Sequence, residues 1–203
     1  MDSVLIIGGG GHAKVVASTL IASGIKISGI IDDDEKKWGQ HIFNIPIAGL
    51  QQYGDISNKK AVIAIGDNSI RKRIAEHMKN VIWETVVHPH SYVHPSASIG
   101  LGTVVFAGAV VQPDAVIGEH CIINSNSSID HDCVIGNFAH IGPGASLAGN
   151  VSVREGAFLG IGTVVIVGKK IGQWATLGAG SVVVTDVDDR VTAVGIPAKP
   201  IER

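Results

Sequence analysis

An aliphatic residue stands at every sixth position of the chain from Val87 to Val183, through 17 consecutive repeats. The position four residues later is nearly always small, as at Ala109, Ala115 and Cys121. Neither the period of a helix nor the alternation of an ordinary strand produces this spacing. It is typical of a coil with three flat faces of six residues, each with one side chain pointing inward and a small residue at the corner. The pattern predicts between five and six coils, whose strands form parallel ladders about 4.8 Å apart.

The repeat has one irregular position. Lys169 occupies a corner where a small or aliphatic residue is usual. We expect either a bulged loop or a distorted coil there. A β-sandwich does not explain the repeat, because its strands need polar turns about every 8–12 residues and would lose the phase.

The first 85 residues follow a different pattern, in which buried strands alternate with helices. The predicted strands cover residues 2–8, 26–32 and 59–67, and helices follow the first and the third of them. The first helix has an apolar face formed by Ala13, Val16, Ala17 and Leu20. This βαβ…βα order predicts a parallel α/β sheet, half of a Rossmann fold, with ligands at the carboxyl ends of the strands.

The turn after the first strand, GGGGHA, carries the residues of a nucleotide fingerprint. Gly8, Gly10 and Ala13 fit the spacing G-x-G-x-x-A, and Asp32 follows 22 residues after Gly10. However, the unit ends near residue 85, about half the length that a complete dinucleotide site needs. A glycine turn at a helix N-terminus still holds phosphates. The sequence therefore predicts a mononucleotide that carries another group, rather than NAD.

Composition narrows the classes of function. The chain is 45 % apolar and 4 % aromatic with 26 glycines, which favours short strands and tight turns. A net charge of −2 gives no general attraction to nucleic acid or anionic membranes. No stretch approaches the roughly 20 apolar residues of a membrane span, and the N-terminus lacks the features of a signal peptide. Two cysteines, Cys121 and Cys133, argue against a disulfide framework, so we expect a cytoplasmic protein.

The clearest candidate chemistry lies in the stretch SIDHDC, where His131 stands between Asp130 and Asp132. A histidine suits a general base because its pKa lies near neutrality, and a carboxylate at its other ring nitrogen fixes the tautomer. One coil further on is Gly149, so the neighbouring rung has no side chain. An acyl group there would meet both the imidazole and a backbone N–H, the donor that a tetrahedral intermediate needs. The six-residue frame leaves open whether His131 points inward or lies at a corner.

These stretches resemble known families. IGEHCIINSNSSIDHDCVIG, IGQWATLGAGSVV and VGIPAKP resemble hexapeptide-repeat acyltransferases. With GGGGHAKVV, IDD and AIGDNSIRKRI, the entire chain resembles bacterial nucleotide-sugar N-acetyltransferases of the bacillosamine-pathway type, to which sialic-acid O-acetyltransferase-like proteins are related. The resemblance implies a homotrimer of left-handed β-helices with acetyl-CoA in the grooves between subunits. It also implies a nucleotide-sugar-binding domain over residues 1–85 and an acetyltransferase domain over 86–203, whose C-terminal tail contacts CoA.

The resemblance assigns catalytic roles to the SIDHDC stretch and its neighbours. His131 matches the proposed general base of the family, and Gly149 matches the backbone donor. Either Asp132 or Asp130 orients the histidine; the family often has Glu here, so the shorter side chain leaves the choice open. His140 matches a second histidine near the acetyl group or the acceptor sugar.

The resemblance also implies two binding sites. The residues expected to approach the nucleotide sugar are Gly8, Gly10, Gly11, His12, Asp32, Asp33, Gly66, Asp67 and Asn68. Asp67 or Asn68 is also a candidate helix N-cap. Lys14 and Arg71 either meet phosphate or lie on exposed helix faces. For CoA, the later coils offer small residues for close approach and lysines for its phosphates, and the expected contacts are His140, Gly149, Gly160, Gly162, Gly178, Ala179, Lys169, Lys170 and Lys199.

The predicted reaction transfers an acetyl group from acetyl-CoA to the amine of a nucleotide-linked 4-amino-4,6-dideoxy sugar, first of all a UDP sugar, by direct attack. Acetylation of a sialic acid or another sugar hydroxyl is an alternative, because the same base serves it. A second alternative is a trimer without enzymatic activity that senses nucleotides or serves as a scaffold. Cys133 reads as a small corner residue rather than a nucleophile. We expect no metal site at His88, His90 and His94, because successive coil positions splay their side chains. UDP, dTDP and GDP all fit Asp32 and Asp33.

Overall fold

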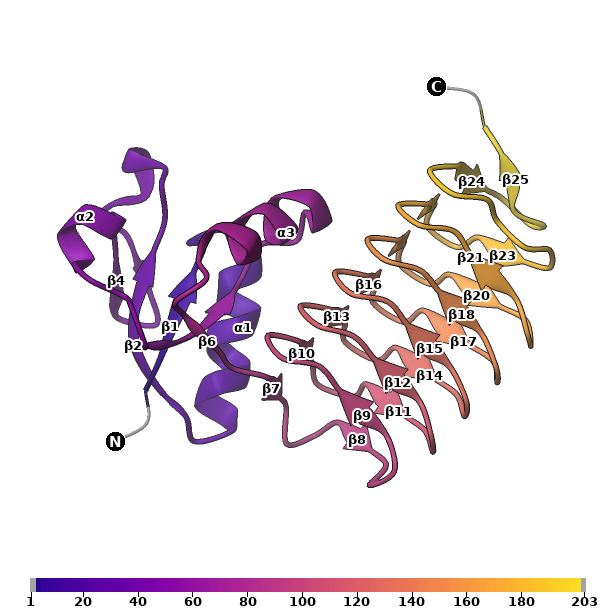
Figure 1. Ribbon diagram of the computed structural model, residues 1–203, viewed down its shortest axis with the longest axis horizontal. Coiled ribbons are helices and arrows are strands. Elements are labelled where there is room, and N and C mark those ends of the chain that lie inside the picture. The colour runs from indigo at the N-terminus through magenta and orange to yellow at the C-terminus, as the bar shows by residue number, and fades with distance from the viewer. Residues whose placement is uncertain (1–2, 202–203) are drawn as a thin grey trace.

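The computed structural model describes residues 3–201, which form a small α/β domain and a long three-sided β-helix (Figure 1). The α/β domain contains one six-stranded sheet in the order β3-β4-β2-β1-β5-β6. All neighbouring strands are parallel except β3 and β4. Its elements are β1 Ser3–Ile7, α1 Gly11–Ala22, β2 Lys26–Ile31, the short 3-10 helix η1 Glu35–Lys37, β3 His41–Ile42, β4 Ile45–Ala48, α2 Leu50–Tyr53, β5 Lys60–Ile63, α3 Asn68–His77 and β6 Ile82–Trp83.

The predicted α/β order is confirmed, and the structure adds elements that the sequence pattern did not reveal. The apolar face of α1 is buried as expected, through Ala13, Val16, Ala17 and Leu20. The prediction of a third strand over residues 59–67 was too long, because β5 ends at Ile63. The unpredicted β3 and β4 form a hairpin around Phe43 and Asn44, whose φ angles are 48° and 66°. These strands are too short for an alternating pattern to be visible.

The β-helix has three parallel sheets, which differ in strand number. The eight-stranded sheet comprises β7 Val86–Val87, β10 Val104–Val105, β13 Ile122–Ile123, β16 His140–Ile141, β19 Phe158–Leu159, β22 Thr176–Leu177, β24 Thr192–Val194 and the antiparallel β25 Lys199–Pro200. The six-stranded sheet comprises β8 Tyr92–Val93, β11 Val110–Val111, β14 Ser128–Ile129, β17 Ser146–Leu147, β20 Val164–Val165 and β23 Val182–Val183. The five-stranded sheet comprises β9 Ser98–Ile99, β12 Val116–Ile117, β15 Val134–Ile135, β18 Ser152–Val153 and β21 Lys170–Ile171.

We name each edge of the prism by the two sheets that meet there: the eight/six, six/five and five/eight edges. Strands pair with a constant offset of one coil, as between Ile129 and Leu147. The aliphatic side chains of the six-residue frame and the small residues of the edges fill the interior together. Val87 stays in register with the inward Val105, as the frame predicts, but it is 37 % exposed because it lies at the open end of the first coil.

The predicted irregularity at Lys169 is absent, since Lys170 and Ile171 stay in register with the coil before them. The true departure lies in the last coil. Ile171 bridges to Val187, 16 residues on, and Thr176 pairs with Thr192 at the same distance, so this coil is two residues short. The six-residue frame therefore ends after Val183.

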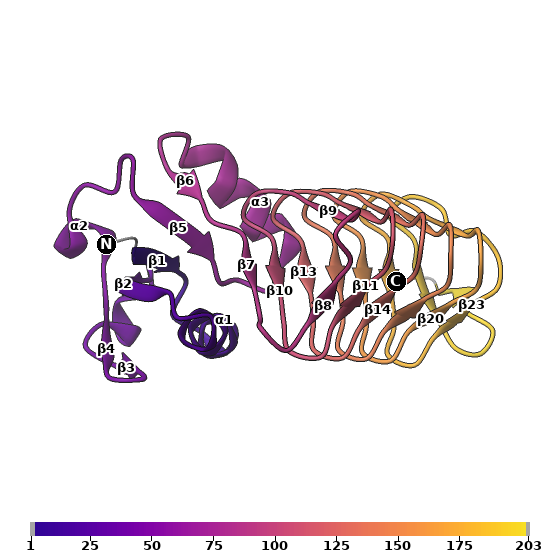
Figure 2. The same cartoon turned by 90° about the horizontal axis from the view of Figure 1, so that it is seen from below.

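The two regions share one apolar core. On the eight-stranded sheet, the outward side chains of the first three rungs are Val86, Val104 and Ile122, and all three are buried against the apolar face of α1. Both views show α1 lying along β7 and β10 (Figures 1 and 2). Among residues 3–201, no helix is long and apolar enough to cross a membrane.

Candidate active site

His131 lies at the six/five edge, between β14 and β15, and its side chain is 58 % exposed. The question that the six-residue frame left open is thus answered, since the ring points outward from a corner. Its Nδ1 lies 2.7 Å from the Oδ2 of Asp132, whereas Asp130 accepts a hydrogen bond from the His131 backbone N–H at 2.8 Å. The two aspartates therefore have separate tasks: Asp132 contacts the ring and Asp130 contacts the backbone.

The carboxylates make this histidine a better base. The hydrogen bond to Asp132 raises the pKa of His131 above its ordinary value, and the charge of Asp130 acts in the same direction. An ionised carboxylate only accepts hydrogen bonds, so Nδ1 carries the hydrogen and Nε2 keeps its lone pair. Nε2 lies beside Gly149 at an exposed edge, where a substrate can approach it.

Gly149 lies one rung from His131 on the same edge, as the stacking predicts. A Cβ atom added to Gly149 would lie 2.6 Å from both Cε1 and Nε2 of the ring. Only a glycine therefore fits beneath the imidazole in this position. Within residues 3–201, the backbone N–H of Gly149 donates to no protein acceptor. The edge thus presents a basic nitrogen beside a free N–H donor, the two groups that attack on a thioester requires.

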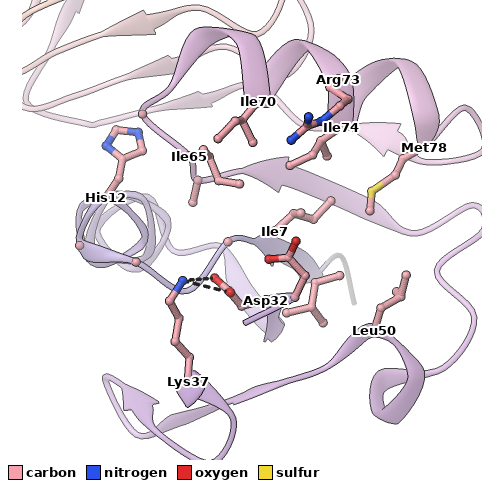
Figure 3. A pocket seen from close by; sticks show the side chains of 17 residues that line it. Ile7, His12, Asp32, Lys37, Leu50, Ile65, Ile70, Arg73, Ile74 and Met78 are labelled. Atoms are coloured by element: carbon pink, nitrogen blue, oxygen red, sulfur yellow. Dashed lines mark hydrogen bonds and ion pairs between the residues drawn. The ribbon is translucent and has the colours of Figure 1, made fainter. Parts of the chain in front are cut away.

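A second candidate site is a pocket of about 560 Å³ at the carboxyl ends of β1, β2 and β5. Figure 3 shows His12 at one end of this pocket and Leu50 and Met78 at the other. Added Cβ atoms on Gly10 and Gly11 would meet nothing within 4 Å, so the glycine turn is open to the pocket. The N-cap of α1, Gly10, has no capping side chain, which leaves the first N–H groups of the helix free for an anion. Gly8 has a φ of 108°, and a Cβ there would lie 2.8 Å from Ile65.

The acidic residues of this pocket differ in what they can offer a ligand. Asp32 accepts from the backbone N–H of Gly9 at 2.6 Å and from Lys37 at 2.9 Å (Figure 3). Burial raises the pKa of Asp32, but these hydrogen bonds and that of Asp34 outweigh the effect and lower it. Asp33 is exposed and lines the pocket. Asp32 therefore holds the glycine turn in place, while Asp33 keeps its carboxylate for a ligand.

The structure gives Arg71 a role that the sequence did not suggest, and both alternatives for it were wrong. Its side chain is 1 % exposed, and its donors meet protein acceptors at the domain boundary. Lys14 is exposed and does not line the pocket. Asp67 is the N-cap of α3, accepting from Ile70 N at 2.8 Å. Asn68 is buried and donates to Gly156 O at 3.0 Å, and it lines a second hollow between α3 and the β-helix instead of the 560 Å³ pocket.

Three further histidines lie where the domains meet: His120 and His140 are buried, and His12 is partly buried. Burial, with a contribution from the Arg71 charge, lowers the pKa of His12 and His120 to about 4 and that of His140 to about 3. All three are thus neutral at physiological pH. His140 bonds Asn124 through Nε2 at 3.0 Å. Its place on the outward face of the eight-stranded sheet separates it from His131 within one chain.

The residues expected to hold CoA lie on different sides of the prism. Gly149 and Lys169 share the six/five edge with His131. Gly160, Gly162, Gly178 and Ala179 lie on the eight/six edge. Lys170 faces outward from the five-stranded sheet, and Lys199 is exposed on β25. A single chain therefore does not gather these residues into one site.

The cysteines fit structural positions. Cys133 is buried on the six/five edge and its Sγ donates to Ala148 O at 3.2 Å. Burial raises the pKa of both thiols, that of Cys121 to about 11, which suppresses nucleophilic thiolate. Across residues 3–201 no group of three or more His, Cys, Asp or Glu side chains is placed to hold a metal ion.

Sequence reasoning missed two cations that line the pocket, Lys37 and Arg73. Arg71 and Arg73 are two residues apart and therefore face opposite sides of α3. Arg73 shares the pocket side with Ile70 and Ile74. The apolar pair Ile70 and Ile74, at i and i+4, marks the side of α3 that faces the pocket. In the sequence alone, such a pair looks the same as the apolar face of a helix that packs on a protein core.

Comparisons with known proteins agree with this architecture. Residues 3–78 match the PglD N-terminal domain, and residues 114–149 match the bacterial transferase hexapeptide (six repeats). The structure of PerB from Caulobacter crescentus, in complex with CoA and GDP-perosamine, is 39 % identical with a TM-score of 0.91 and covers 100 % of this chain and 98 % of its own. The acetyltransferase domain of PglB from Neisseria gonorrhoeae is 36 % identical with a TM-score of 0.92, covering 99 % and 100 % of the two chains.

A curated relative, UDP-N-acetylbacillosamine N-acetyltransferase of Bacillus subtilis, is 41 % identical over 111 residues, 52 % of this chain and 51 % of the relative. The chain thus spans about half of that relative, and it spans 21 % of a second, from Acanthamoeba polyphaga mimivirus. The fold and the edge site define a left-handed β-helix acyltransferase. More narrowly, the chain belongs to the family of hexapeptide-repeat sugar N-acetyltransferases with a PglD-type N-terminal domain.

Proposed function

We propose that the protein transfers an acetyl group from acetyl-CoA to the amine of a nucleotide-linked 4-amino-4,6-dideoxy sugar. The observation that carries the proposal is the six/five edge, where His131 is oriented by Asp132 and lies beside the free N–H of Gly149. Acetyl coenzyme A bound to the PglB domain, and CoA with GDP-perosamine bound to PerB, support both substrates.

In the proposed reaction, Nε2 of His131 takes a proton from the sugar amine as its nitrogen attacks the thioester carbon. The Gly149 N–H stabilises the developing oxyanion. The C–S bond then breaks, and the imidazolium returns the proton to the leaving CoA thiolate. Asp132 keeps the ring in the tautomer that this requires, with no covalent enzyme intermediate.

The nucleotide part belongs in the 560 Å³ pocket. Its diphosphate meets the open N-terminus of α1, near His12, and Asp33 and Arg73 are available to the ribose and base. A UDP sugar is the first substrate to test, because the name of the B. subtilis relative specifies a UDP sugar. A GDP sugar is the second, because PerB is complexed with GDP-perosamine.

The distribution of the site residues supports a homotrimer. His131 lies on the six/five edge, whereas the pocket and His140 lie with the eight-stranded sheet. We infer that the histidine of one chain meets the sugar held by its neighbour, with the eight/six glycines lining the CoA groove. A cytoplasmic location stays a prediction.

A thiol-release assay tests the function directly. The screen offers acetyl-CoA with UDP-, GDP- and dTDP-linked 4-amino-4,6-dideoxy sugars and with free sialic acid. We expect release with at least one nucleotide-linked amino sugar and none with sialic acid. Release with sialic acid alone would replace the proposal by O-acetylation, and no release with any acceptor would leave only the scaffolding alternative.

A further inference from the structure

Two side chains of helix α3 donate hydrogen bonds to backbone carbonyls along one edge of the β-helix. His120, Phe138 and Gly156 occupy the same corner position in three successive coils of the five/eight edge, and their φ angles are 52°, 60° and 68°. The backbone therefore turns in the same way at each of these rungs. Arg71 donates from Nε to His120 O at 2.7 Å and from Nη2 to Phe138 O at 2.8 Å. Asn68 Nδ2 continues the series, with Gly156 O at 3.0 Å.

These contacts form a connected unit, which we call the clasp: Arg71 and Asn68 with the carbonyls of His120, Phe138 and Gly156. The two side chains bond each other, from Arg71 Nη2 to Asn68 Oδ1 at 2.8 Å. One guanidinium and one amide thus donate hydrogen bonds to three consecutive rungs, which are spaced about 4.8 Å apart. A shift of α3 along the prism axis would break the hydrogen bonds to all three of these carbonyls together.

The same guanidinium also holds the wall of the nucleotide pocket. Arg71 Nη1 donates to Ile65 O at 3.0 Å and to Gly66 O at 3.2 Å. Both residues line the pocket, and Gly66 also lines a second hollow between α3 and the β-helix. The clasp therefore links the loop that borders the ligand to fixed heights on the prism.

Burial and geometry make Arg71 hard to replace. The side chain is 1 % exposed, and within the described chain its hydrogen-bond acceptors are all carbonyl oxygens, while the charge of Asp67 acts on it without a direct ion pair. A guanidinium presents its donors in a rigid planar fork, whereas a lysine ammonium is a flexible point charge. The arrangement requires the fork, because its acceptors lie in two domains.

We propose that Arg71 and Asn68 are positioning residues that set the height of the nucleotide pocket along the β-helix, and thereby select which amino position of the bound sugar is acetylated. The inference rests on the proposed function. A misplacement of about 1 Å can cost about 100-fold in rate. The 3- and 4-amino groups of a pyranose are closer together than two neighbouring rungs of the β-helix. A shift of the pocket by less than one rung, which a loosened clasp permits, therefore lets the wrong amine reach the base.

The test compares wild type with the variants Arg71→Lys, Arg71→Met and Asn68→Ala. Each is assayed by thiol release with a nucleotide-linked 4-amino sugar and with its 3-amino isomer. We expect kcat/KM for the 4-amino sugar to fall about 10- to 100-fold and its ratio over the 3-amino isomer to fall about tenfold, while KM for acetyl-CoA stays unchanged. Arg71→Lys keeps a charge without the fork and should restore little of the selectivity.

The matched control is Lys72→Met. Lys72 is the next residue of α3 and also crosses the domain boundary, through an ion pair of 2.5 Å with Glu155. Its ammonium lies 6.0 Å from the centroid of the Phe138 ring, but it donates no hydrogen bond to the pocket loop or to the carbonyls of the clasp. A partly exposed pair of this kind contributes little. This variant should retain the wild-type ratio between the two sugars. If it lost the ratio as the clasp variants do, general loosening of the boundary would explain the effect and the proposal would fail.

Equal losses on both sugars, with their ratio unchanged, would assign Arg71 and Asn68 to stability alone and overturn the proposal. Should Arg71→Met not fold, Asn68→Ala decides the matter. If wild type acetylates no nucleotide amino sugar, the proposed function fails separately. Amide hydrogen exchange then still tests the clasp: faster exchange over residues 64–67 in Asn68→Ala, with β14 and β17 unaffected, supports it, and unchanged exchange contradicts it.

Discussion

Histidine side chains have opposite properties at the six/five edge and at the domain boundary. At the edge, His131 is exposed and paired with Asp132, which raises its pKa. At the boundary, burial and the nearby Arg71 charge hold the pKa of His140 at about 3. His131 is thus a base whose pKa lies above that of an ordinary histidine, while His140 is a hydrogen-bonding group that is neutral at physiological pH.

The difference shows that the position on the prism decides the chemistry of a histidine. A corner exposes the ring and leaves room for a flanking aspartate, whereas the covered sheet face removes the ring from water. Proton transfer should therefore depend on the edge alone.

The largest effect is expected from His131→Ala. Loss of the general base should lower kcat for thiol release by about 100- to 10,000-fold, with KM for acetyl-CoA nearly unchanged. His94→Ala is the control, because His94 lies on the same edge two coils earlier and bonds Ser96 rather than an aspartate. Activity near wild type in His131→Ala would remove the edge from the mechanism.

Gly149→Ala should be the next most damaging change. The new Cβ would lie 2.6 Å from Cε1 and Nε2 of His131 and would displace the ring. We expect kcat to fall about 100-fold with little change in thermal stability. Val167→Ala, one coil further along the same edge, should leave kcat close to wild type. An active Gly149→Ala would show that the slot beside the ring is not used.

Asp132→Asn separates the two aspartates through the pH profile. The neutral imidazole is the base, so the rate rises with pH through the pKa of His131, above the 6.5 of an ordinary histidine. Removing the charged partner lowers that pKa, so the rising limb should move to lower pH while the plateau falls about tenfold. Asp130→Asn should move the limb less, because Asp130 bonds the backbone N–H. The reverse order would make Asp130 the orienting acid.

Asp32→Asn extends the contrast to carboxylates. Asp32 is mostly buried and accepts charged and backbone donors, so its loss should lower the free energy of unfolding by about 2 kcal/mol at pH 7. Because its pKa in the folded protein is lowered below 3.8, this contribution is complete above that value and is lost as pH falls through the folded pKa. Urea unfolding at pH 7, and again at a pH below the folded pKa of Asp32, measures this contribution. Asp33→Asn, at the exposed neighbour, should change stability little.

The smallest effect on the pH profile is expected from His140→Gln. A pKa of about 3 places the titration of His140 far below the working range. The amide of glutamine retains a hydrogen bond to Asn124, so the rising limb of the rate should stay where it is in wild type. A shifted limb would mean that the buried boundary takes part in proton transfer.

The β-helix was predictable from the sequence because one inward residue in every six fixes a coil regardless of what surrounds it. The stacking of Gly149 beside His131 followed from the same arithmetic. Burial at the domain boundary was not predictable, because it arises only where the two domains meet: Arg71 was expected to meet phosphate or to lie on an exposed helix face, and it is 1 % exposed. The short last coil was not predictable either, because the bridge between Ile171 and Val187 does not follow the six-residue repeat.

A complementation experiment tests the central claim, that the histidine of one chain acts on the sugar held by another. His131→Ala chains are co-expressed with Gly11→Phe chains, whose new ring fills the open space beside the glycine turn, and mixed oligomers are purified through two different tags. Each homo-oligomer should be inactive in thiol release, and the mixed oligomer should recover a substantial part of wild-type activity. A mixed oligomer as inactive as both parents would place the base and its sugar in the same chain and contradict the account.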